Sequence, residues 1–291
     1  MSSPEVLLAG PDSGAGSSEL FLAGPDSAAG ARIQRALEDF VEGVTRYEIW
    51  STLAWQDIRK RYQRSILGPF WITLTMLVTI GGMGPIYAIL FRVDVRTFLP
   101  YLSLGIITWG LISPLILESC TVFQQSEKLI QSVRLPMTTY IAKLIYSNVL
   151  IFLHNILAFI PIMLVFSIRP QWVWLMAVPG VLLIIITAIP VGFILGSLCT
   201  RFRDLQPIVG SLIQLLFFLT PIFWKASMLG PRQYLVNFNP FFLFVELVRG
   251  PISGYMPSGK VYIGVGLVIV VLYAVALPLF ARCRQRIAFW V

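Results

Sequence analysis

Charged residues are scarce in this chain, and long stretches have almost none. Asp, Glu, Lys and Arg make up 12% of the 291 residues, and hydrophobic residues make up 57%. Soluble domains carry roughly 25% charged residues, so the composition excludes an ordinary soluble domain. Apolar blocks near the length of roughly 20 residues that cross a bilayer as a helix occur at Phe70–Leu90, Tyr101–Phe123, Ile141–Ile168, Val173–Leu198, Pro207–Trp224 and Val261–Phe280. They predict an integral membrane protein.

Groups that bind metals or catalyse reactions are also few. The chain has one histidine, His154, and its three cysteines (Cys120, Cys199 and Cys283) have neither metal-site nor disulfide spacing. A multi-span enzyme acting on a polyprenyl lipid needs acidic or histidine clusters near the membrane surface. Carboxylates are sparse and no Asp–Asp pair is present, so such an enzyme is the less favoured alternative. We expect no catalytic residue, metal or cofactor in this chain.

A complete ATP site is missing from the sequence as well. The stretch GYMPSGK at 254–260 matches most of a phosphate-binding loop, but Val261 stands where Ser or Thr holds the magnesium ion. The stretch also follows no predicted strand. ATP-driven work therefore requires a partner subunit, which would hold the ATP and the magnesium ion.

The apolar blocks predict an all-α membrane protein with six transmembrane helices. Backbone groups in lipid have to be hydrogen-bonded internally, and the alternating pattern of membrane barrel strands is missing. With an even number of spans both termini share one side, which carries 15 of the 22 Lys and Arg residues. This excess predicts that both termini are cytoplasmic. The net charge of +8 then reflects orientation in the membrane rather than a nucleic-acid surface.

Two segments precede the six-span domain, which we place at 66–291. Residues 1–30 are rich in Gly, Ala, Ser and Pro and predict a disordered tail. Residues 31–65 have helical periodicity and a basic cluster, which predict an amphipathic interface helix along the cytoplasmic membrane face. A helix packed on a soluble partner is a compatible alternative. The side chains assigned to the interface helix are Asp57, Arg59, Arg61, Tyr62 and Arg64.

The cytoplasmic loop at 124–140 has a short amphipathic pattern that ends before Pro136. The residues of this pattern are Glu127, Lys128, Leu129, Ile130, Val133 and Arg134. Two spans can be connected without such a helix. We therefore favour a docking element for another protein over a plain connector.

The external segment from Lys225 to Lys260 contains an apolar stretch, 234–248, that is too short to span and is interrupted by Pro240. Glu246 and Arg249 are three residues apart and are expected to pair on one helix face. The segment predicts a re-entrant helical hairpin before the last span. Because broken helices at membrane depth need protein or a water-filled cavity around them, the hairpin indicates a transport pathway.

Aromatic residues cluster in the apolar blocks and in this hairpin. An interfacial belt or core packing explains any single one of them. As a set, they also offer flat apolar faces along which a sugar chain can slide. The candidates for such a substrate path are Trp71, Tyr87, Trp109, Phe218, Phe223, Phe238 and Phe242.

Four stretches of the sequence resemble a known family. They are LAWQDIRKRYQRSILGPFW at 53–71, KLIQSVRLPMTTY at 128–140, CTRFRDLQPIVGSLIQLLFFLTPIFW at 199–224 and NPFFLFVELVRGPISG at 239–254. They are similar to the permease subunit of type-2 ATP-binding-cassette exporters, in the Wzm/TagG-like group that exports lipid-linked polysaccharide. In that family the first stretch is the interface helix, the second is the coupling segment and the last is the external re-entrant hairpin.

The resemblance implies a function and a set of partners. It implies a homodimer around a central channel in the bacterial inner (cytoplasmic) membrane, with two cytoplasmic ATPase subunits beneath it. The cargo would be a lipid-linked glycan such as O-antigen, capsule or teichoic polymer. A type-2 exporter of a drug or small lipid has the same fold and stays as an alternative. Two stretches are assigned to coupling with the ATPase. The first is the set of loop residues between 127 and 134 named above, and the second consists of Arg201, Arg203 and Asp204.

Overall fold

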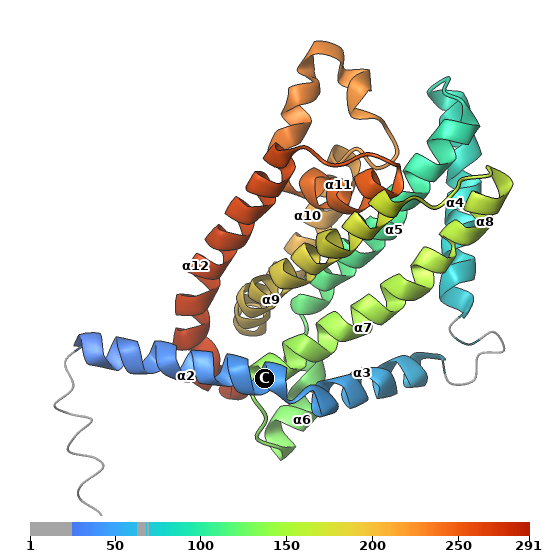
Figure 1. The fold of residues 1–291 in the computed structure, drawn as a ribbon. Coiled ribbons are helices and arrows are strands. Elements are labelled where there is room, and N and C mark those ends of the chain that lie inside the picture. Colours follow the sequence, from blue (N-terminus) through green and yellow to red (C-terminus); the bar gives the residue numbers. More distant parts are fainter. Residues whose placement is uncertain (1–24, 63–67, 69) are drawn as a thin grey trace, which may run out of the picture.

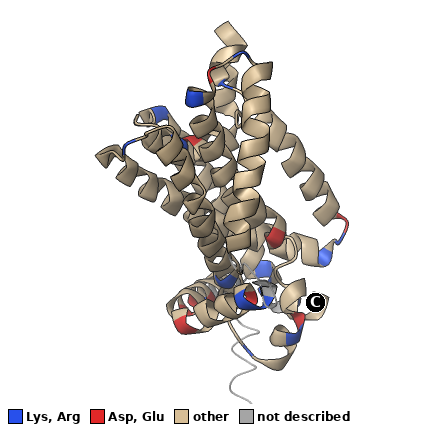
Figure 2. Cartoon of the chain, turned by 90° about the vertical axis from the view of Figure 1, so that its right-hand side faces the viewer, with Lys and Arg blue, Asp and Glu red and all other residues tan. Residues whose placement is uncertain are grey.

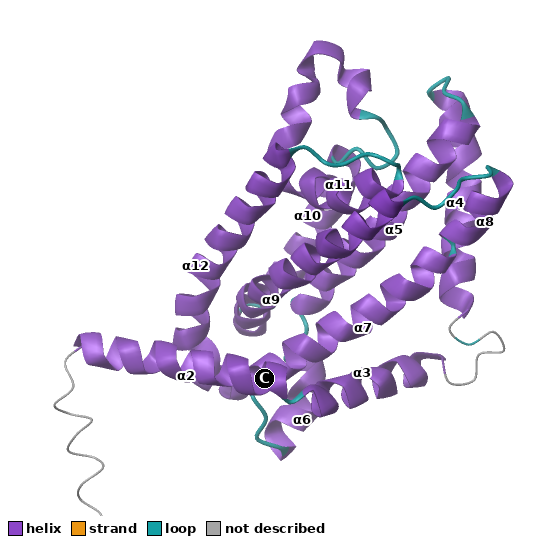
Figure 3. Cartoon of the chain, viewed as in Figure 1, coloured by secondary structure: helices purple, strands orange, loops and turns teal. Residues whose placement is uncertain are grey.

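The computed structural model describes residues 25–62, 68 and 70–291, and the regular elements in these ranges are all helices (Figures 1 and 3). In chain order they are α2 (Pro25–Thr45), α3 (Tyr47–Tyr62), α4 (Phe70–Leu90), α5 (Val95–Ser119), η1 (Gln124–Ser126), α6 (Glu127–Ser132), α7 (Met137–Leu157), α8 (Phe159–Val165), η2 (Trp172–Met176), α9 (Ala177–Arg201), α10 (Leu205–Leu219), η3 (Ala226–Phe238), α11 (Pro240–Ile252) and α12 (Gly259–Trp290). The all-α prediction is therefore confirmed for the described part of the chain.

Five helical stretches in this part are long and apolar enough to cross a membrane. They are Phe70–Leu90, Val95–Ser119, Met137–Val165, Trp172–Arg201 and Gly259–Arg284. The remaining apolar block, predicted at 207–224, forms the 15-residue helix α10. This helix stops early because Thr220, which precedes Pro221, is extended (φ −86°, ψ 134°), as a residue before proline prefers to be.

The position of α10 follows from two contacts with helix α5 and the turn after it. Before α10 in the chain, the Cys199 carbonyl near the end of α9 accepts from the side chain of Gln124, which lies just after α5 (3.2 Å). After α10 in the chain, the carbonyls of Pro221 (3.0 Å) and Trp224 (3.1 Å) accept from the hydroxyl of Tyr101, near the start of α5. The chain therefore travels along the length of α5 between residues 199 and 221.

The molecule has two distinct ends, which we call the α6 end and the α11 end (Figure 1). The α6 end holds α2, α3, α6 and the end of α12, and the α11 end holds η3, α11 and the start of α12. Charged positions concentrate toward these ends, and the helices between them are largely free of charge (Figure 2). This distribution is typical of a chain whose middle lies in lipid.

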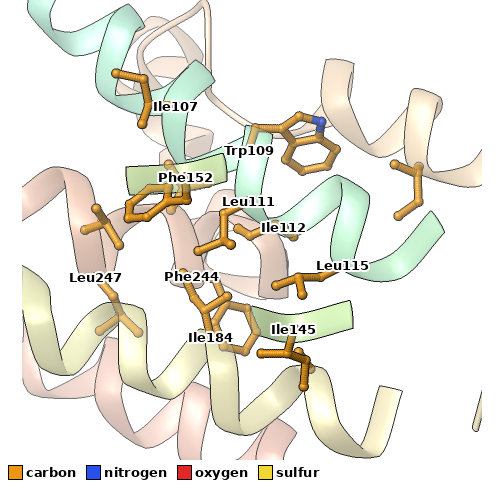
Figure 4. Packing of buried hydrophobic residues seen from close by; sticks show 14 of the residues in the cluster. Ile107, Trp109, Leu111, Ile112, Leu115, Ile145, Phe152, Ile184, Phe244 and Leu247 are labelled. Carbon is orange, nitrogen blue, oxygen red and sulfur yellow. The ribbon is translucent and has the colours of Figure 1, made fainter. Parts of the chain in front are cut away.

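Buried apolar side chains of α5, α7, α9 and α11 meet in the core between the two ends (Figure 4). Trp109 and Leu111 of α5 are within this cluster, together with Ile184 of α9 and Phe244 of α11. Helices α9 and α11 approach closely at Gly180, where an added Cβ would lie 2.5 Å from the Leu247 carbonyl oxygen. The core thus fixes α11 against the long helices.

The N-terminal region differs from its prediction in two respects. Helix α2 begins at Pro25, inside the predicted tail of residues 1–30, and proline is favourable in the first turn because it lacks only an N–H that would be unpaired there. The rest of that tail prediction, 1–24, lies outside the described residues. The interface segment predicted at 31–65 is divided into α2 and α3 at Arg46, because α2 packs on α7 and α12 while α3 packs mainly on α7.

Candidate functional site

The predicted coupling segment lies at the α6 end, with α6 projecting beyond the long helices (Figure 1). Its charged side chains Glu127, Lys128 and Arg134 are exposed. Leu129 and Ile130 are half-buried against the chain's own core, whereas Val133 is 46% exposed. The segment therefore offers a surface of mixed charge with one open apolar side chain, the composition of a small protein interface.

The second predicted coupling stretch lies at the same end. The Arg201 guanidinium at the end of α9 stacks over the rings of Phe202 (5.1 Å) and Trp290 (5.4 Å). Arg203 and Asp204, in the turn before α10, are exposed. Because α6 also contacts α12, the fold gathers both predicted coupling stretches around the C-terminal part of α12.

Asp39 of α2 is a residue of this end that sequence reasoning missed. Its carboxylate is 2% exposed and accepts from the backbone N–H of Met137 (3.1 Å) and from both the N–H (3.1 Å) and hydroxyl (2.8 Å) of Thr138. Arg284 Nε of α12 donates to the same carboxylate (2.8 Å). The one feature of the sequence that hints at this contact is Pro136. Its side chain cannot cap helix α7, which follows it, so the first N–H groups of α7 need an acceptor from elsewhere.

Helix α3, the second part of the predicted interface segment, is anchored on α7. It buries Ala54 and Ile58, one turn apart, and Asp57 pairs with Lys143 of α7 (2.7 Å). Arg59 is exposed. The side chains of Arg61 and Tyr62, and Arg64 as a whole, lie outside the described residues.

The α11 end carries the predicted hairpin segment. The first arm, η3, contains Gly230 at φ 54°, a conformation that glycine adopts readily. Helix α11 then begins with a side-chain cap, since Asn239 Oδ1 accepts from the Phe241 N–H (3.0 Å). The Asn239 amide also donates to the Thr220 hydroxyl (3.0 Å), so the start of α11 is attached to the turn after α10.

Glu246 and Arg249 form the ion pair that their spacing predicts, and the pair is buried. Arg249 Nη2 lies 2.7 Å from Glu246 Oε2, with the Arg249 side chain 1% exposed. Arg249 Nη1 donates to the Pro221 carbonyl (2.6 Å), and its guanidinium lies 4.0 Å from the centre of the Tyr101 ring. A buried charge is tolerated only when it is paired and hydrogen-bonded, and Arg249 has both kinds of partner.

Tyr255, in the loop after α11, completes this ionic cluster. Its hydroxyl donates to the other carboxylate oxygen of Glu246. Burial and the neighbouring Glu246 carboxylate raise the pKa of Tyr255 above its usual range, so the phenol keeps its proton and remains a donor at neutral pH. The cluster of Tyr101, Glu246, Arg249 and Tyr255 thereby joins α5, α11 and the loop before α12.

The predicted path aromatics are only partly brought together. Phe217, which was not among the path candidates, links them: its ring lies 5.5 Å from Trp109, 5.6 Å from Phe218 and 5.2 Å from Phe223. Tyr87 extends the row, with its ring 5.4 Å from Phe223. Ring contacts of this kind are ordinary aromatic packing geometry.

The other path candidates lie apart from this row. Phe242 lies beside Arg249, whose guanidinium is 5.8 Å from its ring. Trp71 is 54% exposed and Phe238 is 79% exposed. An exposed aromatic side chain at a membrane surface suits an interfacial belt, so geometry groups only some of the seven candidates.

The stretch that resembles a phosphate-binding loop has another role. It forms the loop after α11 and the start of α12. Gly254 in this loop has a φ of 91°, and a Cβ added there would lie 3.1 Å from the side chain of Gln171, so the glycine leaves room for that side chain. It lies at the α11 end, opposite the exposed coupling segment. Among the described residues, no group of three or more His, Cys, Asp or Glu is placed to hold a metal ion.

Comparison with known proteins gives a consistent result. A family model described as ABC-2 type transporter matches residues 48–252. The chain is 27% identical over 253 residues to the "O-antigen export system permease protein RfbA" of Myxococcus xanthus, which covers 81% of this chain and 93% of the relative. It is 23% identical over 239 residues to the protein of the same name in Klebsiella pneumoniae, which covers 80% of this chain and 91% of the relative.

Proposed function

This chain belongs to the ABC-2 type transporter family, and on that premise we propose that it is the membrane subunit of an exporter of lipid-linked polysaccharide. The observation that carries the proposal is the match to O-antigen export permeases over most of both chains. The chain is a transport subunit and not an enzyme. Its cargo would be a glycan on a lipid carrier, moved outward across the cytoplasmic membrane.

The energy would come from a separate ATPase subunit bound at the α6 end. The exposed residues of α6 and of the turn at 203–204 support this placement, because α6 and the end of α9 both contact α12, the latter through Arg201 and Trp290. Two copies of this chain and two ATPase subunits, which hold ATP and magnesium, would form the complete exporter. The α6 end would then face the cytoplasm, and we expect both chain termini on that side of the membrane.

Six crossings of the membrane, with α10 as the fifth, are part of the proposal. The contacts at Cys199 and Pro221 support it, since they place the two ends of α10 at opposite ends of α5. The segment from 225 to 260 would be external, with α11 as its re-entrant helix. The interface region predicted at 31–65 would lie along the cytoplasmic membrane face. A reagent that cannot cross the membrane should label a cysteine placed at Ser227 from outside; labelling only from the cytoplasmic side would contradict this topology.

The sugar chain would pass along the aromatic row from Trp109 to Tyr87. The partial exposure of Tyr87 and Phe217 and the 54% exposure of Phe218 support this path, and the buried rings of Trp109 and Phe223 would hold the row in place from the core. Each ring would contribute little alone, about 1 kcal/mol by analogy with aromatic pairs. Polymer could then slide without being held.

The proposal is tested by reconstituting the complex with the ATPase subunit in proteoliposomes. We expect the polyprenyl-linked glycan fraction of the host to stimulate ATP hydrolysis and to be translocated. Polyprenyl phosphate without sugar and amphiphilic drugs serve as controls. Stimulation by the drugs alone would favour the exporter of a drug or small lipid and would overturn the polysaccharide assignment.

A further inference from the structure

The junction between α6 and α7 is held by a residue that is distant in sequence. Only residues 133–136 separate the two helices, and the residue before α7, Pro136, makes no side-chain cap bond. The first N–H groups of a helix need acceptors, and a negative charge is favourable there. Asp39 of α2 meets both requirements, since its carboxylate accepts from Met137 and Thr138.

The same carboxylate is fixed from a third helix. Arg284 Nε of α12 donates to it (2.8 Å), and Arg284 Nη1 donates to the Arg35 carbonyl of α2 (2.7 Å). The helices also leave no space for sliding, because a Cβ added at Gly43 of α2 would lie 2.6 Å from Thr138 Cβ. One buried carboxylate therefore joins α2, α7 and α12 at a single point.

We propose that Asp39 is a positioning residue that transmits movement of the docking helix α6 to both α7 and α12. The inference rests on the proposed function, in which an ATPase subunit moves α6. A displacement of α6 acts directly on the start of α7, where Asp39 is attached. With Asp39 in place, the start of α7, helix α2 and the end of α12 move together. Without it, α2, α7 and α12 keep only their packing contacts, and less of the movement reaches α12.

Two residues of this device, Asp39 and Arg284, lie outside the region 48–252 that matches the family model, whereas Met137 and Thr138 lie inside it. The device thus attaches the parts of this chain that flank the matched region to the coupling segment within it. Helix α12 packs on α9 and α11 as well. Movement at the α6 end would consequently reach α11, the helix that carries the buried ion pair.

The decisive variant is Asp39→Asn, which keeps the side-chain size but removes the charge and one acceptor oxygen. The complex of the full chain with its ATPase subunit is used throughout. We expect backbone hydrogen exchange to rise severalfold at one of the two N–H groups of Met137 and Thr138, because the amide keeps only one of the two oxygens that accept from them. We also expect ATP hydrolysis to continue while the amount of glycan exported per ATP falls severalfold. The matched control is Glu42→Gln, one turn further along α2, whose exposed carboxylate pairs with Arg46 just after the end of that helix.

Arg284→Gln separates the two halves of the device. It should leave hydrogen exchange at the start of α7 unchanged and still lower the export per ATP, because only the link to α12 is lost. If Asp39→Asn does not fold, the proposal is tested with Arg284→Gln instead. Unchanged export per ATP in Arg284→Gln then overturns the proposal. Assembled Asp39→Asn complex with normal exchange and normal export per ATP would do the same. If the unmodified chain binds no ATPase subunit, the proposed function fails instead, and the exchange result for Asp39 still shows whether the cap exists.

Discussion

The two ends of the molecule use charged residues in different ways. At the α11 end, Glu246 and Arg249 belong to one helix and are buried. At the α6 end, the ion pairs Asp39–Arg284 and Asp57–Lys143 join different helices, and each has one partner that is 32% or 48% exposed. A buried pair resists any change that separates it, because an uncompensated charge would remain. Asp39 is itself buried and so also resists separation from its partner, whereas the pair of Asp57 and Lys143, with Asp57 48% exposed, can be broken and formed again at low cost.

This difference indicates a rigid α11 end and an α6 end that is fixed at Asp39 but adjustable where α3 meets α7. Rigidity suits a hairpin that would line a pathway, and adjustability suits a surface that would respond to an ATPase subunit. Four substitutions test the comparison, and their expected effects decrease in size.

The largest effect is expected for Arg249→Ala. It leaves Glu246 buried without its partner, which should lower the free energy of unfolding by about 3–5 kcal/mol. Thermal unfolding of the purified chain in detergent measures the loss. The double variant Glu246→Met with Arg249→Met removes both charges and should unfold at a higher temperature than Arg249→Ala. Equal unfolding temperatures for Arg249→Ala and the exposed control Arg46→Ala would show that this ion pair does not stabilise the α11 end.

Gly180→Ala should have the next largest effect. The added methyl group meets the backbone carbonyl of Leu247 at 2.5 Å, and backbone cannot give way as a flexible side chain does. Such overpacking costs about 1–3 kcal/mol, to be measured by the same unfolding experiment. Gly266→Ala in α12 is the control, since nothing lies within 4 Å of its added Cβ. A stable Gly180→Ala variant would mean that α9 and α11 can separate easily.

A smaller effect, on binding rather than on folding, is expected at the α6 end. Val133→Ala should weaken association with the ATPase subunit by about 1 kcal/mol, because it removes exposed apolar surface that the interface would bury. Lys128→Ala should change it less. Leu129→Ala with Ile130→Ala should weaken association too, but also the fold, since both side chains pack on the chain's own core. Co-purification measures binding, and an unchanged yield for all three variants would exclude α6 as the docking surface.

The smallest effect is expected for Asp57→Asn. Asp57 is half exposed to solvent in its pair with Lys143, and such surface pairs contribute roughly 0.2–1 kcal/mol. The unfolding temperature should therefore fall only slightly, and less at high salt. A loss as large as that of Arg249→Ala would contradict the distinction between the two ends.

The sequence predicted those features that depend on neighbouring residues. The apolar blocks of α4, α5, α7, α9 and α12 were visible as continuous runs, and the pairing of Glu246 with Arg249 follows from their spacing on one helix. The break after α10 was less evident, since an apolar run continues through Thr220 and Pro221 to Trp224. Only the extended conformation of Thr220 shows where the helix ends.

Features that join distant parts of the chain could not be predicted in this way. Asp39 looks like an ordinary polar position of an amphipathic helix, and its partners Thr138 and Arg284 are 99 and 245 residues away. The half-burial of Leu129 and Ile130 likewise depends on the core that α6 meets. Hydrophobic periodicity identifies the apolar face of a helix but does not say whether the same chain or a partner covers it.

The shortness of α10 bears on the lipid around the protein. A helix of 15 residues is about 22 Å long, whereas the hydrocarbon layer is about 30 Å thick. Where a crossing helix of this length meets lipid, hydrophobic mismatch thins the bilayer beside it. If α10 crosses the membrane as proposed, the apolar barrier is thinnest next to this helix, and a hydrophilic sugar would have the shortest distance to travel out of water there.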